Sequence, residues 1–397
     1  MSEKKRKEIV VIAKGSGISN FYSAANTKCY YIAKILEEGN FDVTILSSIY
    51  YQEKPLIKTK GEYCGIAFYA PSVYEKTNLK TVLIINKIIH GWRVIKYLLF
   101  IRLTKGKSYY IFDDNSVFLP ILLILDKLNV IELIFNIEEW PLAHNISWLG
   151  QYSAHYFSVL AIKSCKKIIC VSSFLAAKTL EYNKKSKTII LPAITIFDKF
   201  KENNQFVGYE KSKLVRFLYC GNIGYYEVIE EIIESFDQIA TSRIDVNIEL
   251  VLILSGDSSL LDKIYKRITG LHSIITIKKQ LTRSELLDEY SKATCFFAPL
   301  RDTLQDQARF PQKLSEYTSF SKPIITTNVG DIGKYFQHEK NAIFIDDFST
   351  KSLVEKINYV IDNLELVHNI GIEGKNVGLK FFDYKQYVSS LEEFVSS

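Results

Sequence analysis

Residues 295–327 read CFFAPLRDTLQDQARFPQKLSEYTSFSKPIITT. The first four residues form a short apolar run of the kind that buried strands use, and Pro323–Thr327 form a second one. Between these runs, Pro311 fits the first turn of a helix, where its missing N–H costs nothing. A strand, a helix and a second strand in this order predict a parallel βαβ unit.

The same alternation extends on both sides of this stretch. Apolar runs such as residues 41–46 (FDVTIL) and 167–171 (KIICV) are each followed by a helix-like segment. The alternation pauses in the polar residues 198–213 and restarts at residues 217–220. This pattern predicts an α/β protein with two Rossmann-like, doubly wound domains that face a cleft.

The pause and the last helix set the expected domain boundaries. We predict an N-terminal domain in residues 1–195 and a C-terminal domain in residues 212–375. We expect residues 376–397 to form a helix that packs back toward the first domain.

Composition and charge limit the kinds of partner. Of 397 residues, 47% are apolar and 24% charged, as in soluble globular proteins. Residues 1–200 hold 27 Lys or Arg against 16 Asp or Glu (27 − 16 = +11), and the remainder holds 23 against 28 (23 − 28 = −5). This asymmetry argues against nucleic acid as a partner and indicates that the first half meets an anionic surface or substrate, unless the surplus has no function.

The cysteines and the apolar runs predict the compartment. The six cysteines form no CxxC pair, which favours buried thiols in a reducing cytoplasm. No stretch has about 20 mostly apolar residues in a row, so we expect no membrane span.

Lys313 and Glu316 are three residues apart, so they share one face of the helix that Pro311 begins. A helix N-terminus, a cation and a carboxylate together suit a nucleotide diphosphate: amides and ammonium for the phosphates, carboxylate for the ribose diol. The alternative is an ordinary salt bridge on a helix surface, which contributes little stability.

A longer pattern contains this pair. Phe310-Pro-x-Lys-x-x-Glu316-Tyr-x-x-x-x-Lys322-Pro-Ile, followed by Thr326-Thr-x-x-Gly330, resembles the donor-site signature of GT-B glycosyltransferases, and most closely that of family 4 (group 1). Residues 217–222 and 250–257 resemble the strands and turns that open the C-terminal domain of that family. The resemblance covers residues 160–365 best.

The resemblance implies a transferase (EC 2.4, hexosyltransferase type) that moves a sugar from a nucleotide-diphosphate donor to a glycan or lipid-linked acceptor. Bacterial surface polysaccharide synthesis is the implied pathway, with a retaining, metal-independent mechanism and no cofactor. Glu316 would bind the ribose hydroxyls, and Lys313 with the amides of Arg309 and Phe310 would hold the diphosphate. The loop residues that would approach the nucleotide are Gly221, Asn222 and Gly330.

Two departures from the family pattern concern the sugar and the phosphates. Ala308 stands where the family often has a glutamate eight residues before Glu316, and Gln305 and Arg309 are the candidates to replace it. Residues 222–227 (NIGYYE) lack the Arg and Lys that often follow the first glycine loop, so Arg309 is also a candidate for the missing charge.

The N-terminal half offers weaker candidates. Gly15 and Gly17 lie between the first strand and helix, where they either approach the donor or form an ordinary turn. Glu138 and Glu139 follow the strand that ends near Phe135, and one of them would orient or deprotonate the acceptor hydroxyl unless both are solvated loop residues. Six scattered histidines without an HxxxH spacing predict no metal site.

Residues 81–107 combine a strongly apolar helix with interspersed Lys and Arg. They either lie on an anionic membrane surface, at the inner face of the cell membrane, or form a core helix whose cations extend to water. Two other functions remain open for the chain: a sugar-nucleotide epimerase of the same fold, and a degenerate transferase that binds without catalysis.

Overall fold

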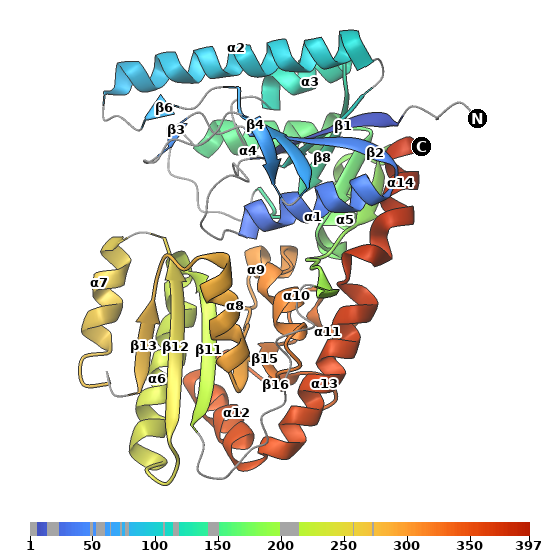
Figure 1. The fold of residues 1–397 in the computed structure, drawn as a ribbon. Helices are drawn as coiled ribbons and strands as arrows, with labels where there is room; N and C mark the ends of the chain where they lie inside the picture. The colour runs from blue at the N-terminus through green and yellow to red at the C-terminus, as the bar shows by residue number, and fades with distance from the viewer. Residues whose placement is uncertain are drawn as a thin grey trace. The chain divides into compact units, whose positions relative to one another are not determined.

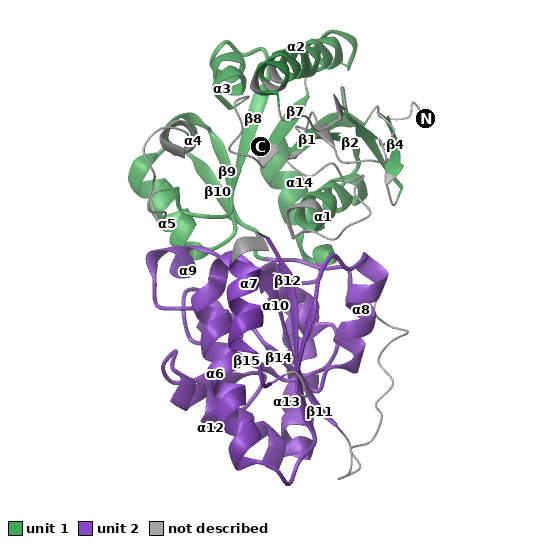
Figure 2. Cartoon of the chain, turned by 90° about the vertical axis from the view of Figure 1, so that its left-hand side faces the viewer, with its two compact units in different colours: residues 1–192, 384–397 green, residues 193–383 purple. Residues whose placement is uncertain are grey.

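The computed structural model describes residues 6–13, 24–47, 51–52, 60–63, 65–71, 74–75, 79–105, 108–113, 119–141, 151–198, 214–256, 258–271 and 274–397. It divides into two compact units, coloured separately in Figure 2. Unit 1 comprises residues 1–192 and 384–397, and unit 2 comprises residues 193–383. Each unit is an α/β domain built on a largely parallel sheet, which confirms the predicted fold class.

The chain passes from unit 1 to unit 2 after Pro192 and returns at Tyr384. The expected crossings lay at residues 195 and 376. The second crossing comes later because helix α13 (Leu364–Phe381) continues past residue 376 without a break.

The main sheet of unit 1 has the strand order β10-β9-β8-β7-β1-β2-β5-β4. Its strands are β1 (Lys7–Ala13), β2 (Phe41–Ser47), β4 (Lys60–Tyr63), β5 (Ile66–Tyr69), β7 (Tyr109–Asp113), β8 (Glu132–Ile137), β9 (Lys167–Cys170) and β10 (Lys187–Ile190). Only the pairing of β4 with β5 is antiparallel among these described strands. A small separate sheet pairs β3 (Tyr51–Gln52) with β6 (Tyr74–Glu75).

Helices cover both faces of this sheet. They are α1 (Ala24–Glu38), α2 (Lys80–Lys105), α3 (Leu119–Lys127), α4 (Gln151–Ser164), α5 (Ser173–Tyr182) and α14 (Val388–Ser396). Figure 1 shows α2 and α3 on one side of the sheet and α1 on the other. The C-terminal segment, 3₁₀ helix η3 (Tyr384–Tyr387) and α14, belongs to unit 1: Tyr384 Oη donates to Glu38 at 2.6 Å, and Lys167 Nζ donates to the Val395 carbonyl at 2.7 Å. None of the described helices is long and apolar enough to cross a bilayer.

The sheet of unit 2 has the order β13-β12-β11-β14-β15-β16, and its pairings are parallel. Its strands are β11 (Val215–Asn222), β12 (Ile248–Ser255), β13 (Ile275–Lys278), β14 (Cys295–Phe297), β15 (Ile324–Thr327) and β16 (Ile343–Ile345). The accompanying helices are η2 (Ile223–Tyr225), α6 (Tyr226–Ser242), α7 (Ser258–Arg267), α8 (Arg283–Lys292), α9 (Leu304–Ala308), α10 (Gln312–Thr318), α11 (Ile332–Tyr335), α12 (Thr350–Asp362) and α13.

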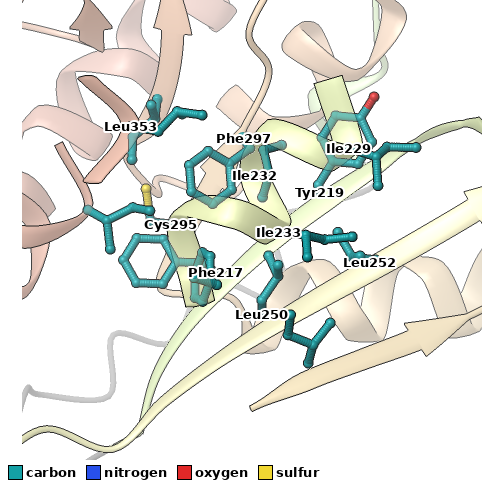
Figure 3. Packing of buried hydrophobic residues seen from close by; sticks show 14 of the residues in the cluster. Phe217, Tyr219, Ile229, Ile232, Ile233, Leu250, Leu252, Cys295, Phe297 and Leu353 are labelled. Carbon is teal, nitrogen blue, oxygen red and sulfur yellow. The ribbon is translucent and has the colours of Figure 1, made fainter. Parts of the chain in front are cut away.

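The core of unit 2 lies between the sheet and helices α6 and α12. Phe217 on β11 packs against Phe236 on α6 and Phe297 on β14, with ring centroids 5.5 and 5.6 Å apart. Figure 3 shows three isoleucines of α6 and Leu353 of α12 beside these rings. Leu218, which points to the opposite face of β11, is also fully buried. Burial of both faces explains why these strands are continuous apolar runs in the sequence.

Helix α13 was not predicted as an element of its own: we expected one last helix in residues 376–397, which includes only the end of α13. Glycines 371, 374 and 378 weakened the helical pattern, because glycine is a poor helix former. In the structure they form the closely packed side of α13, where Gly371 and Gly374 meet backbone and Gly378 meets the side chains of Thr318 and Phe197. A Cβ on Gly371 would lie 2.6 Å from the Ser321 carbonyl oxygen, and one on Gly374 would lie 2.9 Å from that of Asn341.

We therefore expect Gly371→Ala to lower the free energy of unfolding by about 1–3 kcal/mol, although alanine is the better helix former, since overpacking against backbone is costly. Denaturant unfolding of the variant measures this change. Glu373→Ala, at an exposed position of the same helix, is the matched control and should change stability by less than about 0.5 kcal/mol. A stabilised Gly371→Ala variant would contradict the packing described here.

Candidate functional site

The strand order of unit 2 marks one edge as the place for a ligand. From β11 the chain crosses to β12 on one side, and β14 later pairs on the other side of β11. The carboxyl ends of β11 and β14 therefore flank a topological switch point, where ligands bind in open α/β sheets. The loop after β11 begins at Gly221, and the loop after β14 leads through α9 to α10.

Two side chains of α10 hold the end of β11. Lys313 Nζ donates to the Cys220 carbonyl at 3.2 Å, and the Cys220 N–H donates to Tyr317 Oη at 3.1 Å. These side chains are four residues apart, so they project from the same face of the helix. The Lys and Tyr of the sequence motif thus bind both polar groups of one residue and set the position of the glycine loop that follows it.

Lys313 lies where burial strongly affects its charge. Its Nζ is 4.0 Å from the centre of the Tyr219 ring, which is fully buried. Burial, and after it the neighbouring charge of Arg309, lower the pKa of the Lys313 amine to about 7. The cation that the sequence assigns to the diphosphate is therefore one that titrates near neutral pH.

Glu316 is completely buried and makes an ion pair with Arg283, whose Nη1 lies 2.9 Å from Glu316 Oε1. Arg283 begins helix α8, and its side chain is 31% exposed. A ribose hydroxyl could hydrogen-bond to the Glu316 carboxylate only if the Arg283 side chain moved away or shared this carboxylate with the ribose. Arg283 was not among the predicted residues, because it precedes Glu316 by 33 residues in another βα unit.

Two arginines lie beside the loop that lacks a cation of its own. Fully buried Asp306 Oδ1 pairs with Arg309 Nη2 at 2.8 Å, and its Oδ2 pairs with Arg301 Nε at 3.1 Å. Arg309 and Arg301 lie over the Tyr225 ring, with their Cζ atoms 4.0 and 5.8 Å from its centre. Arg301 Nη1 also pairs with Glu227 Oε2 at 2.7 Å.

Arg301 and Arg309, which follow β14 in the chain, thus bring positive charge to residues 222–227. Arg309 was among the candidates for that charge in the sequence. Arg301 and Asp306 were missed, and the available signal was an arginine four residues after the end of β14, in the loop at the switch point.

The remaining predicted residues of unit 2 have structural roles in this fold. A Cβ on Gly221 would lie 2.6 Å from Tyr219 Oη, so the ring beneath it leaves room only for glycine. The Asn222 side chain caps η2 by accepting from the Gly224 N–H at 2.7 Å. Gly330 has φ of +61°, and a Cβ there would lie 2.9 Å from the Gln307 carbonyl. Phe310 is buried against the rings of Tyr335 and Phe382.

In unit 1, Glu138 follows β8 at the carboxyl edge of the sheet. Its Oε1 lies 2.6 Å from Nζ of buried Lys28 on α1 and accepts from Asn136 Nδ2 at 3.1 Å. The Glu138 side chain is 35% exposed, so it is partly open to a ligand while Lys28 fixes its position. Glu139 is exposed. Lys28 and Asn136 were not among the predicted residues, although a lysine on the apolar face of α1 was a visible anomaly.

Gly15 and Gly17 lie outside the described residues. Within the described parts of the chain, no group of three or more His, Cys, Asp or Glu side chains is placed to hold a metal ion.

Comparison with known proteins finds a family that matches the part of the chain that contains this site. Residues 200–377 match the family described as glycosyl transferases group 1. These residues span nearly all of unit 2, so unit 2 matches the group 1 glycosyltransferases. The match covers the switch point, the two arginines and the whole α10 motif. It confirms the resemblance to this group; the narrower assignment to family 4 stays a prediction.

A curated relative extends the similarity in sequence. An uncharacterized glycosyltransferase of Methanocaldococcus jannaschii is 26% identical over 235 residues, which are 57% of this chain and 58% of that protein. The matched stretch thus spans little more than half the length of this relative.

Solved structures show that the fold is GT-B. Sucrose-phosphate synthase from Thermosynechococcus elongatus has a TM-score of 0.76 at 13% identity and covers 98% of both chains. Anabaena HepE in complex with UDP and glucose has a TM-score of 0.71 at 11% identity and covers 99% of this chain and all of that one. At these identities the likeness establishes the fold alone.

Proposed function

We propose that this protein is a glycosyltransferase that moves a sugar, of the hexosyl type, from a nucleotide-diphosphate donor to a glycan or lipid-linked acceptor. One observation carries the proposal: Lys313, Arg301 and Arg309 gather at the switch point of a domain that matches the group 1 glycosyltransferases. Departure of the diphosphate leaving group requires that its negative charge be stabilised, and we assign this role to these cations.

The finer assignments rest on the family resemblance together with this charge. The family resemblance supports a metal-independent reaction with retention of configuration. Lys313 and the two arginines, which are also paired with Asp306 and Glu227, are the cations that we assign to the diphosphate. Glu138 is the proposed group that orients or deprotonates the acceptor hydroxyl, because its position is fixed and it is partly exposed. We place the reaction in bacterial surface polysaccharide synthesis, at the inner face of the cell membrane.

The nature of the donor can be tested by thermal shift with UDP-, GDP-, dTDP- and CMP-sugars. Binding to the folded state raises the unfolding temperature, and we expect at least one of the three nucleotide-diphosphate sugars to do so. CMP-sugars are the matched control, because they carry a single phosphate and should have a smaller effect. No shift with any diphosphate sugar at millimolar concentration would contradict the proposal.

Product analysis with the bound donor then separates transfer from isomerisation. A transferase leaves the donor sugar unchanged or hydrolyses it slowly when no acceptor is present. Conversion of the donor into its epimer under these conditions would identify an epimerase instead.

A further inference from the structure

Helix α2 in unit 1 has two apolar faces. One is buried in the unit through Val94, Leu98 and Ile101. The other carries residues 84, 88, 92, 99 and 103, which recur at intervals of four and seven and so form one stripe along the helix. These side chains are exposed: Trp92 by 68% and Leu103 by 85%. Figures 1 and 2 show α2 at the outer side of unit 1, with α3 beside it.

The charge around this stripe has a single sign. Residues 76–112 contain eight Lys or Arg and no Asp or Glu. Exposed apolar residues 85, 89 and 100 widen the stripe to an apolar face of about 160° at 100° per residue. Arg102 and Arg93 lie at the two edges of this wider face, and Lys96 lies within it. Arg93 and Lys96 are exposed, and Arg102 is partly exposed. Long basic side chains at such positions can keep their charge at the level of lipid headgroups while the apolar stripe is buried.

This combination fits a lipid surface better than a protein partner. The core of a protein–protein interface is depleted in charged residues, and lysine is disfavoured there. Helices that lie in the plane of a bilayer instead combine exposed large apolar side chains with Lys and Arg, and they favour anionic lipids.

We propose that α2 docks unit 1 on an anionic bilayer, with its exposed apolar stripe inserted among the lipids and Arg93, Lys96 and Arg102 at the headgroups. The contact is peripheral and lies in the plane of the membrane. The inference goes beyond the proposed transfer reaction, and it would bring the enzyme to a lipid-linked acceptor.

Co-sedimentation of the full chain with vesicles tests the charge requirement. We expect binding to vesicles of phosphatidylcholine with 30% phosphatidylglycerol and much weaker binding to pure phosphatidylcholine. Each cation contributes about a fivefold gain in partitioning, so the combined variant Arg93→Gln, Lys96→Gln and Arg102→Gln should bind roughly 100-fold more weakly. The control variant Lys184→Gln, Lys185→Gln and Lys187→Gln removes the same charge from exposed positions of the same unit and should bind like the wild type.

The apolar stripe is tested separately. Ile88→Gln, Trp92→Gln and Leu103→Gln together should weaken vesicle binding at least tenfold, because the inserted area is lost. Ile244→Gln, at a position 90% exposed in unit 2, should have no effect. With wild-type protein, anionic vesicles should shift tryptophan emission to shorter wavelength, and Trp92→Phe should abolish this shift while binding persists.

Three results would overturn the proposal. The first is equal binding to neutral and anionic vesicles, and the second is an equal loss of binding in the lysine control variant. The third is dissociation of an oligomer by the apolar variant with vesicle binding unchanged, which would assign the stripe to a second copy of the chain. The experiment uses no donor, acceptor or turnover, so its failure leaves the proposed transferase function untouched.

Discussion

Lys313→Met is expected to weaken binding of the nucleotide-diphosphate sugar by about 10- to 100-fold at pH 6.5. The wild-type amine is protonated at that pH, and a charge-assisted hydrogen bond to phosphate contributes about 1.5–3 kcal/mol. Methionine keeps the length and apolar contacts of the side chain beside the Tyr219 ring and removes only the charge and its hydrogen bond. Isothermal titration calorimetry with the donor found by thermal shift measures the loss.

The same lysine predicts a pH dependence with a definite sign. The pKa of Lys313 is about 7 in the free protein, and a bound diphosphate must raise this pKa because it is an opposite charge. Below pH 7 both states are protonated, and this group causes no pH dependence. Above pH 7 binding takes up a proton, so the donor Kd should rise up to tenfold per pH unit, while the Kd of Lys313→Met stays flat.

Stability gives an independent check on Lys313. Its folded pKa lies below the ordinary value for lysine, so the unfolded state binds more protons between about pH 7 and 10. The free energy of unfolding should therefore rise with pH over this range in the wild type and less so in Lys313→Met. A donor Kd that is independent of pH in the wild type, or unchanged in the variant, would remove Lys313 from the phosphate site.

Glu316→Ala is expected to abolish measurable donor binding, a loss of 100-fold or more. A carboxylate that accepts from two ribose hydroxyls makes two charge-assisted hydrogen bonds, each contributing about 1.5–3 kcal/mol. The same variant also leaves Arg283 without its carboxylate, which destabilises the fold, since breaking a buried pair costs more than the pair contributes. Calorimetry and denaturant unfolding are therefore both needed.

The ion pair offers a double-mutant cycle that separates these two effects. Arg283→Ala with Glu316→Ala should recover part of the lost stability and none of the binding. Arg283→Ala alone should keep donor binding or strengthen it, because the carboxylate then has no guanidinium to exchange for the ribose. If the double variant regains donor affinity along with stability, Glu316 has a structural role only.

Several elements of unit 2 could be predicted from the sequence alone. Strands β14 and β15 were predicted to within one residue at each end, because a continuous apolar run reports the burial of its own strand. The α10 motif was also visible, since residues three and four apart share a helix face in any fold. Pro311 precedes the first helical residue by one position, a difference within the usual uncertainty of helix ends.

The failures share one physical cause. Helix α13 was missed because its glycines meet the backbone of residues 321–322 and 341, which only the folded chain brings close. Arg283, Arg301 and Lys28 escaped notice because each pairs with a carboxylate on another element of its unit. Local sequence determined the βα repeats, the group 1 motif and helix α2, in which every charged residue is basic. These features depend only on the spacing of residues that are close in sequence. Only the tertiary structure decided which charged side chains form ion pairs. The partners lie on separate elements, sheet order and packing decide which elements become neighbours, and no short stretch of sequence records either.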